Sequence, residues 1–260
     1  MILKILLSTS LLLSSAFAIT GLEVAQKVHD REDGDNSTSN MTMTLIDKSG
    51  QKRVRELKTF TKDKGDDELK LMFFLSPADV ENTAFLTYDY DDSDKDDDQW
   101  LYLPELKKVK RIASSDKSSS FMGSDFTYSD MTSRNVEDYT YKIMKETQVD
   151  GHKVWQMLVV PKTKKTIDET GYTKSIIFVR QDNFVIVQAL HYVKIGKKLK
   201  YMKVLELEKI EGVWTVTKMQ MVTKKGRKTL HKTLFEFRDI KYNQDLEESF
   251  FETRTLKKGL

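Results

Sequence analysis

The sequence predicts a mainly β protein in which successive hairpins build an antiparallel sheet. From Met41 onward apolar residues recur at every second position, which is the period of a strand with one face toward a core. Short polar joints such as Asp150-Gly151 and Glu211-Gly212 separate these segments, and joints of this length make neighbouring strands antiparallel. Many segments are apolar on both faces. We therefore expect about eleven or twelve strands in a twisted meander around a helix, with an apolar cavity or covered faces.

The N-terminal residues 1–18 have the pattern of a secretory signal peptide. Lys4 supplies a positive charge, residues 5–13 are mostly apolar, and Ala16-Phe17-Ala18 is a small-residue cleavage site. The apolar run is too short to cross a membrane as a helix. We expect cleavage after Ala18 and one mature domain over 19–260, a periplasmic protein; an uncleaved N-terminal anchor is the alternative.

The elements of the mature chain follow in order. Apolar residues spaced by three and four after Thr20 predict an amphipathic helix over about 21–31, and Thr20 can cap it. A polar loop at 32–40 leads into the strands. Near the C-terminus, a short helix after Asp245 would dock Phe250 and Phe251 onto the sheet. Alternating segments predict strands at 41–45, 53–60, 69–75, 84–90, 139–143, 154–160, 175–180, 184–193, 199–207, 213–222 and 230–237.

Composition and motifs argue against several classes of function. Lys and Arg number 43 against 40 Asp and Glu, a net charge of +3, whereas nucleic-acid binders are usually strongly basic. There is no cysteine, no G-x-S-x-G nucleophile elbow and no glycine-rich phosphate loop. His191 lies among apolar residues, where a packed, hydrogen-bonded histidine is expected. We therefore expect that the protein is not an enzyme and that it has neither a cofactor nor a nucleic-acid partner.

The acidic run at 89–98 partly matches the pattern of a calcium-binding loop. Asp94, Asp96, Asp98 and Glu105 have the spacing of EF-hand ligands, but Gln99 stands where the loop needs glycine, and strands flank it. A solvated hairpin loop explains the run better, and no metal site is predicted.

The most distinctive stretch runs from Asp98 to Met131. Trp100 and Tyr102 share one face of a short strand that Pro104 ends. Positive charges then mark the return strand, at Lys107, Lys108, Lys110 and Arg111. The following segment, 114–131, is polar but carries large apolar residues around Gly123, and it predicts a lid over a cavity, a docking surface or a plug of the barrel end. Those apolar residues are Phe121, Met122, Phe126, Tyr128 and Met131.

This stretch resembles the LolA-like outer-membrane lipoprotein-sorting proteins of bacteria. The match is to the subgroup with the motif D-D-x-W-x-Y-L-P, here residues 97–104, followed by F-M-G-S-D-F-x-Y-x-D, here residues 121–130. The resemblance implies an incomplete barrel of about eleven antiparallel strands curved around short helices, as in LolA and LolB, with a hydrophobic cavity for acyl chains. It also implies transport of lipoproteins or lipids across the periplasm, and association with transporters of the resistance-nodulation-division type.

Two functions follow as hypotheses. The first is a periplasmic carrier that binds acyl chains and ferries lipoproteins or lipids toward the outer membrane. The alternative is a non-enzymatic accessory subunit that docks on a resistance-nodulation-division transporter without carrying lipid. The expected cavity or lid residues are Trp100, Tyr102, Phe121, Met122, Phe126, Tyr128 and Met131. The expected head-group or partner contacts are Lys107, Lys108, Lys110 and Arg111.

Overall fold

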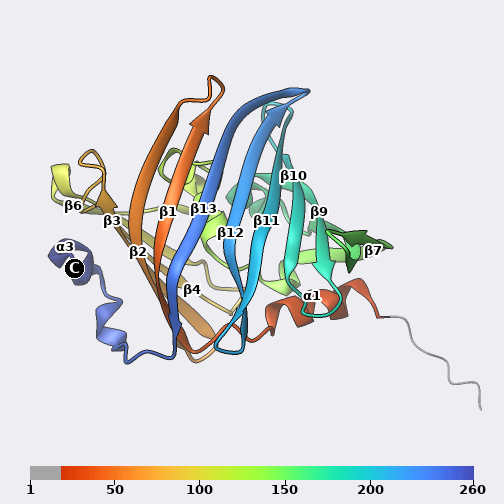
Figure 1. The fold of residues 1–260 in the computed structure, drawn as a ribbon, viewed down its shortest axis with the longest axis horizontal. Coiled ribbons are helices and arrows are strands. Elements are labelled where there is room, and N and C mark those ends of the chain that lie inside the picture. Colours follow the sequence, from red (N-terminus) through yellow and green to blue (C-terminus); the bar gives the residue numbers. More distant parts are fainter. Residues whose placement is uncertain (1–18) are drawn as a thin grey trace, which may run out of the picture.

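Thirteen strands form one sheet in residues 19–260, the part of the chain that this computed structural model describes (Figure 1). The signal-peptide prediction falls outside these residues. The order across the sheet is β6-β5-β4-β3-β2-β1-β13-β12-β11-β10-β9-β8-β7. The strands are β1 (Asn36–Asp47), β2 (Lys52–Lys64), β3 (Asp67–Ser76), β4 (Ala84–Asp89), β5 (Asp98–Leu103), β6 (Lys108–Arg111), β7 (Tyr139–Val149), β8 (His152–Pro161), β9 (Tyr172–Arg180), β10 (Ile186–Val193), β11 (Lys198–Ile210), β12 (Val213–Lys225) and β13 (Lys228–Tyr242).

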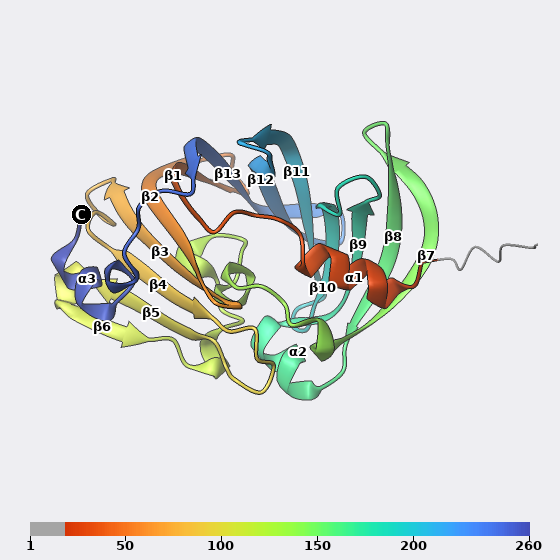
Figure 2. The ribbon, with the colours of Figure 1, turned by 90° about the horizontal axis from the view of Figure 1, so that it is seen from below.

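The sheet confirms the predicted class, a mainly β, antiparallel and incomplete barrel, with thirteen strands instead of about eleven or twelve. It is not one continuous meander. Two meanders, β1 to β6 and β7 to β13, join through the pairing of β1 with β13, where Met43 lies opposite Phe235. The sheet curves into an open trough whose edges are β6 and β7 (Figure 2). Tight hairpins define local neighbours, but only the curvature brings β1 and β13 together.

Residues 112–138, here called the crossing segment, connect the two edge strands. The segment has four short 3-10 turns, η2 (Ser114–Asp116), η3 (Phe121–Gly123), η4 (Tyr128–Met131) and η5 (Val136–Asp138). Phe121 is fully buried and Phe126 is 4% exposed, both in a core cluster with Met43, Phe85 and Phe235. The crossing segment therefore packs inside the trough, against strands on both sides of the β1–β13 junction.

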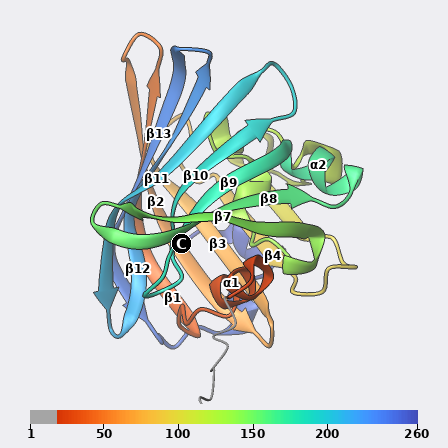
Figure 3. The ribbon, with the colours of Figure 1, turned by 90° about the vertical axis from the view of Figure 1, so that its right-hand side faces the viewer.

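Helix α1 (Gly21–His29) confirms the predicted amphipathic helix. Thr20 and Glu23 form a capping box at its start. Val24 is completely buried, in a cluster formed mainly by β7 to β10. The helix crosses β7 so closely that a Cβ on Gly21 would lie 2.8 Å from the carbonyl oxygen of Tyr141, which only glycine avoids. Figure 3 shows α1 at the open side of the sheet, below β7.

The outer face of β3 to β5 is covered by the C-terminal tail. A turn, η6 (Glu248–Phe250), leads into helix α3 (Thr253–Lys258). Phe251 is fully buried, and the Tyr88 hydroxyl donates to its carbonyl oxygen at 2.7 Å. Phe250 packs edge-on against Phe60, with ring centroids 4.9 Å apart. The predicted docking of both phenylalanines is confirmed, and it explains why these strands are apolar on both faces.

Helix α2 (Lys164–Thr170), between β8 and β9, was not predicted. Thr163 caps it by accepting from the Thr166 amide at 3.1 Å, and Gly171 ends it with a φ of 75°. A threonine before a short polar run and a glycine after it are a weak helix signal, easily taken for a loop. No helix within 19–260 has the length and apolar character needed to cross a membrane.

Candidate binding cavity

A cavity of about 370 Å³ lies between α1, the crossing segment and strands β7 to β12. This volume falls in the range of small-ligand pockets, roughly 300–1,000 Å³. Most of its wall is apolar, from Ala25, Val28, Phe126, Val136, Tyr141, Val159, Ile177, Ile186, Ala189, Met202, Met219 and Met221. The polar residues of the wall are His29, Asp33, Asp130, Thr132, Ser133, Arg134 and His191.

The apolar wall follows from strand alternation. Ile177 and Ala189 are paired across β9 and β10, so their side chains lie on the same, inward face. Met202 and Met221 are paired in the same way across β11 and β12. Methionine is unbranched and polarizable, so this part of the wall can repack around apolar groups of different shape. Met43 is buried in the core and does not line the cavity.

The polar end of the cavity is a hydrogen-bonded group around Asp130. Its Oδ2 accepts from the Tyr172 hydroxyl at 2.7 Å and from the Thr127 amide at 2.8 Å. Arg134 lies nearby, with 3.8 Å between its Nη2 and Asp130 Oδ1. Burial alone would raise the pKa of Asp130, but Lys200 and Arg134, among other neighbours, hold it below its usual value. Asp130 is therefore ionised at neutral pH.

His191 is the packed, hydrogen-bonded histidine expected from its apolar surroundings. Its Nδ1 lies 2.7 Å from the Ser175 hydroxyl, and its ring stacks on Tyr172 with centroids 4.6 Å apart. Burial, with a contribution from the positive charge of Arg134, lowers the pKa of His191 to about 3. The imidazole is therefore neutral at neutral pH and adds no positive charge to the cavity.

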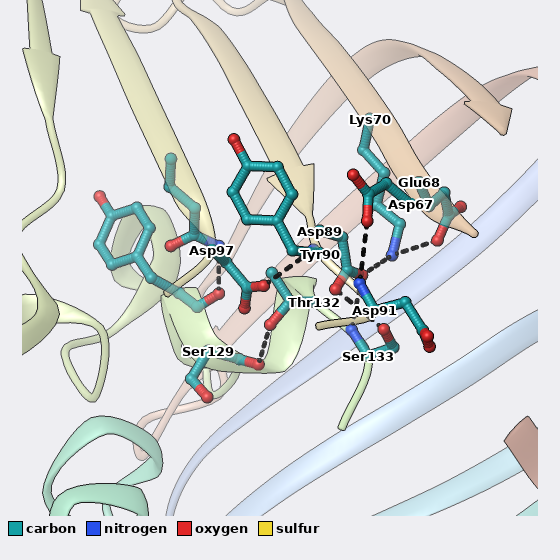
Figure 4. A network of polar contacts seen from close by, with 12 residues as sticks. Asp67, Glu68, Lys70, Asp89, Tyr90, Asp91, Asp97, Ser129, Thr132 and Ser133 are labelled. Carbon is teal, nitrogen blue, oxygen red and sulfur yellow. Dashed lines mark hydrogen bonds and ion pairs between the residues drawn. The ribbon is translucent and has the colours of Figure 1, made fainter. Parts of the chain in front are cut away.

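A second polar network holds the cavity-lining part of the crossing segment (Figure 4). Asp89 accepts from the Ser133 amide at 2.7 Å and from its hydroxyl at 2.9 Å. The Nζ of Lys70 lies 3.0 Å from Asp89 Oδ2 and 2.7 Å from Glu68 Oε2. Burial would lower the pKa of Lys70, but these two carboxylates raise it above its ordinary value, so the lysine stays charged. The network attaches Ser133 to the ends of β3 and β4.

Asp97 lies at the other side of this network. Its Oδ1 accepts from the Tyr90 amide at 3.1 Å, as Figure 4 shows. Burial, and after it the charge of Asp89, raises the pKa of Asp97 to about 6. The Asp97 carboxylate therefore changes charge near pH 6, whereas most other carboxylates are ionised at that pH.

The aromatic and methionine residues proposed for the cavity or lid lie in three places. Phe126 lines the cavity. Phe121 is buried in the inner core cluster, and Met122, Tyr128 and Met131 are partly buried and pack against it. Trp100 and Tyr102 pack on the outer face of the sheet, in the cluster beneath the C-terminal tail.

The four basic residues proposed for head-group or partner contacts are exposed near the β6 edge of the sheet. Arg111 forms an ion pair with Asp98, and Lys110 lies 3.9 Å from Asp116. Lys108 belongs to β6, and Lys107 directly precedes it with a left-handed backbone. In the part of the chain that the structure describes, none of these basic residues lines the cavity.

Sequence reasoning missed most of the cavity wall. Asp130 lies in the motif at 121–130, but the motif does not mark it as a cavity residue, and Arg134 lies outside the motif. Tyr172 and His191 come from neighbouring strands, so only the fold brings them to Asp130. The apolar residues on both faces of 154–160 and 184–193 were the available signal, since one face of each turns toward α1 or the cavity.

Comparison with known proteins places the chain in a family. A family model described as an uncharacterized protein matches residues 66–258. A solved structure from Vibrio parahaemolyticus, described as an outer membrane lipoprotein-sorting protein domain, is 31% identical, with a TM-score of 0.82, and covers 91% of this chain and 98% of its own. The chain belongs to the LolA-like family. A DUF1329 family protein from Desulfovibrio piger is 32% identical, with a TM-score of 0.82, and covers 91% of this chain and 97% of its own.

A more distant LolA superfamily protein has the same fold. It comes from Nitrosomonas europaea and is 18% identical, with a TM-score of 0.68. The match covers 92% of this chain and 100% of that protein. No curated protein matches the sequence. The LolA-like resemblance of residues 97–104 and 121–130 is thus confirmed for the family and the fold.

Proposed function

We propose that this LolA-like protein is a periplasmic carrier that binds acyl chains of lipoproteins or lipids and ferries them toward the outer membrane. The observation that carries the proposal is the apolar cavity of about 370 Å³ between α1 and the sheet. The similarity to an outer membrane lipoprotein-sorting protein domain supports it. Residues 1–18, with the pattern of a signal peptide, support export to the periplasm.

The chemistry of the cavity wall suits a carrier, which must bind and release. Burying one methylene group contributes about 0.8 kcal/mol, so a chain of modest length gives useful affinity without any covalent bond. Met202, Met219 and Met221 provide a wall that adapts to the chain. Two titratable groups of the cavity wall are held by partners, His191 by Ser175 and Asp130 by Tyr172, which supports binding rather than catalysis.

The alternative, docking on a resistance-nodulation-division transporter without lipid, has less support. A docking surface on segment 114–131 would need its large aromatic side chains exposed, but Phe121 and Phe126 are buried in the inner core cluster. The exposed basic residues near β6 fit either a membrane surface or an acidic protein equally well. We therefore retain the carrier as the proposed function.

Mass spectrometry of lipid extracted from the purified protein tests the carrier directly. We expect a copurifying acylated molecule, and displacement of a bound fluorescent fatty acid when excess lipid is added. A protein that contains no lipid and binds no fluorescent fatty acid is not a carrier.

A further inference from the structure

Arg134 lines the cavity, and its guanidinium group has no hydrogen-bond partner among residues 19–260. The nearest carboxylate oxygen, Asp130 Oδ1, lies 3.8 Å away, too far for a hydrogen bond. The side chain is 30% exposed, and it belongs to the cavity wall. An arginine has five N–H donors in a planar fork, so this group retains capacity for an acceptor that enters the cavity.

The guanidinium group is held in position by aromatic rings and by the backbone beside it. It lies 5.9 Å from the ring centroid of Tyr139 and 5.7 Å from that of Tyr172. The preceding residue, Ser133, is attached to Asp89 by two hydrogen bonds. These contacts fix the arginine before a ligand arrives, so little conformational entropy is lost on binding.

Asp130 and His29, which also line the cavity, already have partners. Asp130 Oδ2 is occupied by Tyr172 and Thr127. His29 Nε2 lies 2.9 Å from Asp91 Oδ1, outside the apolar part of the wall. Among the described residues that line the cavity, Arg134 is thus the cation whose N–H groups remain available for a ligand. An anionic oxygen group is the acceptor that suits it best.

We propose that Arg134 binds the anionic head group, a carboxylate or a phosphate, of a lipid whose alkyl chain fills the apolar part of the cavity. The inference rests on the proposed carrier function and adds the class of cargo, a lipid with a negatively charged oxygen head group near its chain. A neutral lipid would leave the guanidinium group unpaired while displacing water from it, which costs affinity.

Equilibrium binding of hexadecanoate and of the neutral hexadecanol to the purified protein, at about pH 8, tests this inference. We expect hexadecanoate to bind roughly 10- to 100-fold more tightly, the value of a hydrogen-bonded charge pair. In Arg134→Gln the two ligands should bind alike, because hexadecanoate loses its partner and hexadecanol no longer leaves a guanidinium group unpaired. Lys225→Gln, at an exposed position at the end of β12 and outside the cavity, is the matched control and should keep the preference for the carboxylate.

The outcomes separate this inference from the carrier itself. Equal affinities for both ligands in the original protein, or an equal loss of both in Arg134→Gln, overturn the head-group role and leave the carrier standing. If neither ligand binds to the original protein, both proposals fall. Should Arg134→Gln not fold, Arg134→Lys replaces it: a reduced carboxylate preference supports the inference and an unchanged one contradicts it.

A further arm distinguishes a lipid head group from a free anion. Hexadecyl phosphate should compete with hexadecanoate at least tenfold better than inorganic phosphate, because only the former also buries an alkyl chain. Inorganic phosphate that competes as well as hexadecyl phosphate would assign Arg134 to free phosphate and overturn the lipid proposal.

Discussion

The ring of Phe126 stacks on that of Phe235, with centroids 4.3 Å apart and planes 15° apart. Phe126 lies in the crossing segment, and Phe235 lies on β13, near the middle of the sheet. The amide of Asp125 donates to the Thr233 hydroxyl at 2.9 Å, one residue before the stack. The segment between the two sheet edges is therefore fixed inside the trough, where Phe126 serves both the core and the cavity wall.

Replacing Phe126 by alanine should destabilise the fold. A large buried side chain is removed and a void remains, so we expect a loss of about 3–5 kcal/mol in the free energy of unfolding, measured by urea denaturation. Leu75→Ala, at an exposed position on β3, is the control and should change stability by less than about 1 kcal/mol. A loss of the same small size for both variants would contradict the anchoring role of Phe126.

Filling the cavity should abolish lipid binding while the protein still folds. Ala189 lines the cavity on β10, and Ala189→Trp places an indole in that space. We expect loss of fluorescent fatty acid binding, with a stability cost of about 1–3 kcal/mol. Leu205→Trp, at an exposed position on β11, adds the same side chain outside the cavity and should bind normally. Normal binding by Ala189→Trp would place the lipid elsewhere.

Affinity should depend on chain length. Each methylene buried in the cavity contributes about 0.8 kcal/mol, so each carbon removed from a saturated fatty acid should weaken binding about fourfold. Calorimetry over a series of chain lengths measures this slope. An affinity independent of chain length would mean that the apolar wall does not hold the chain.

Ionisation of Asp97 should lower the free energy of unfolding above about pH 6. Its pKa is raised from 3.8 to about 6 in the folded protein, so the folded state binds the proton more tightly than the unfolded state does. Ionisation therefore removes stability as the pH rises through about 6, and the cost is absent below about pH 4. Asp97→Asn should stabilise the protein on the order of 1 kcal/mol at about pH 8, with no gain at about pH 4. Thermal unfolding at both pH values measures this, and an equal gain at both would show that ionisation is not the cause.

N-terminal sequencing of the exported protein tests the predicted processing. Cleavage after Ala18 gives a mature chain that starts at Ile19. A protein that retains Met1 in the envelope fraction would instead be anchored by its apolar N-terminal run.

The local features of the fold were accessible from the residues themselves. Alternating apolar residues and joints such as Glu211-Gly212 predicted the hairpins, because strand period and turn chemistry act over a few residues. Thr20 predicted the start of α1 for the same reason. The short α2 was missed because its signals, Thr163 and Gly171, are equally typical of a loop.

Sequence by itself thus determined the class of this protein, its antiparallel hairpins, its amphipathic helix and its LolA-like family. Only the tertiary structure decided that β1 pairs with β13, that Phe121 is core, and that Arg134 and Asp130 meet His191 at the cavity. The reason is physical. Alternating apolar residues indicate that a strand has two different faces, but they do not indicate which face turns inward once the sheet curves. Contacts between residues far apart in the chain follow from that curvature, so no local pattern encodes them.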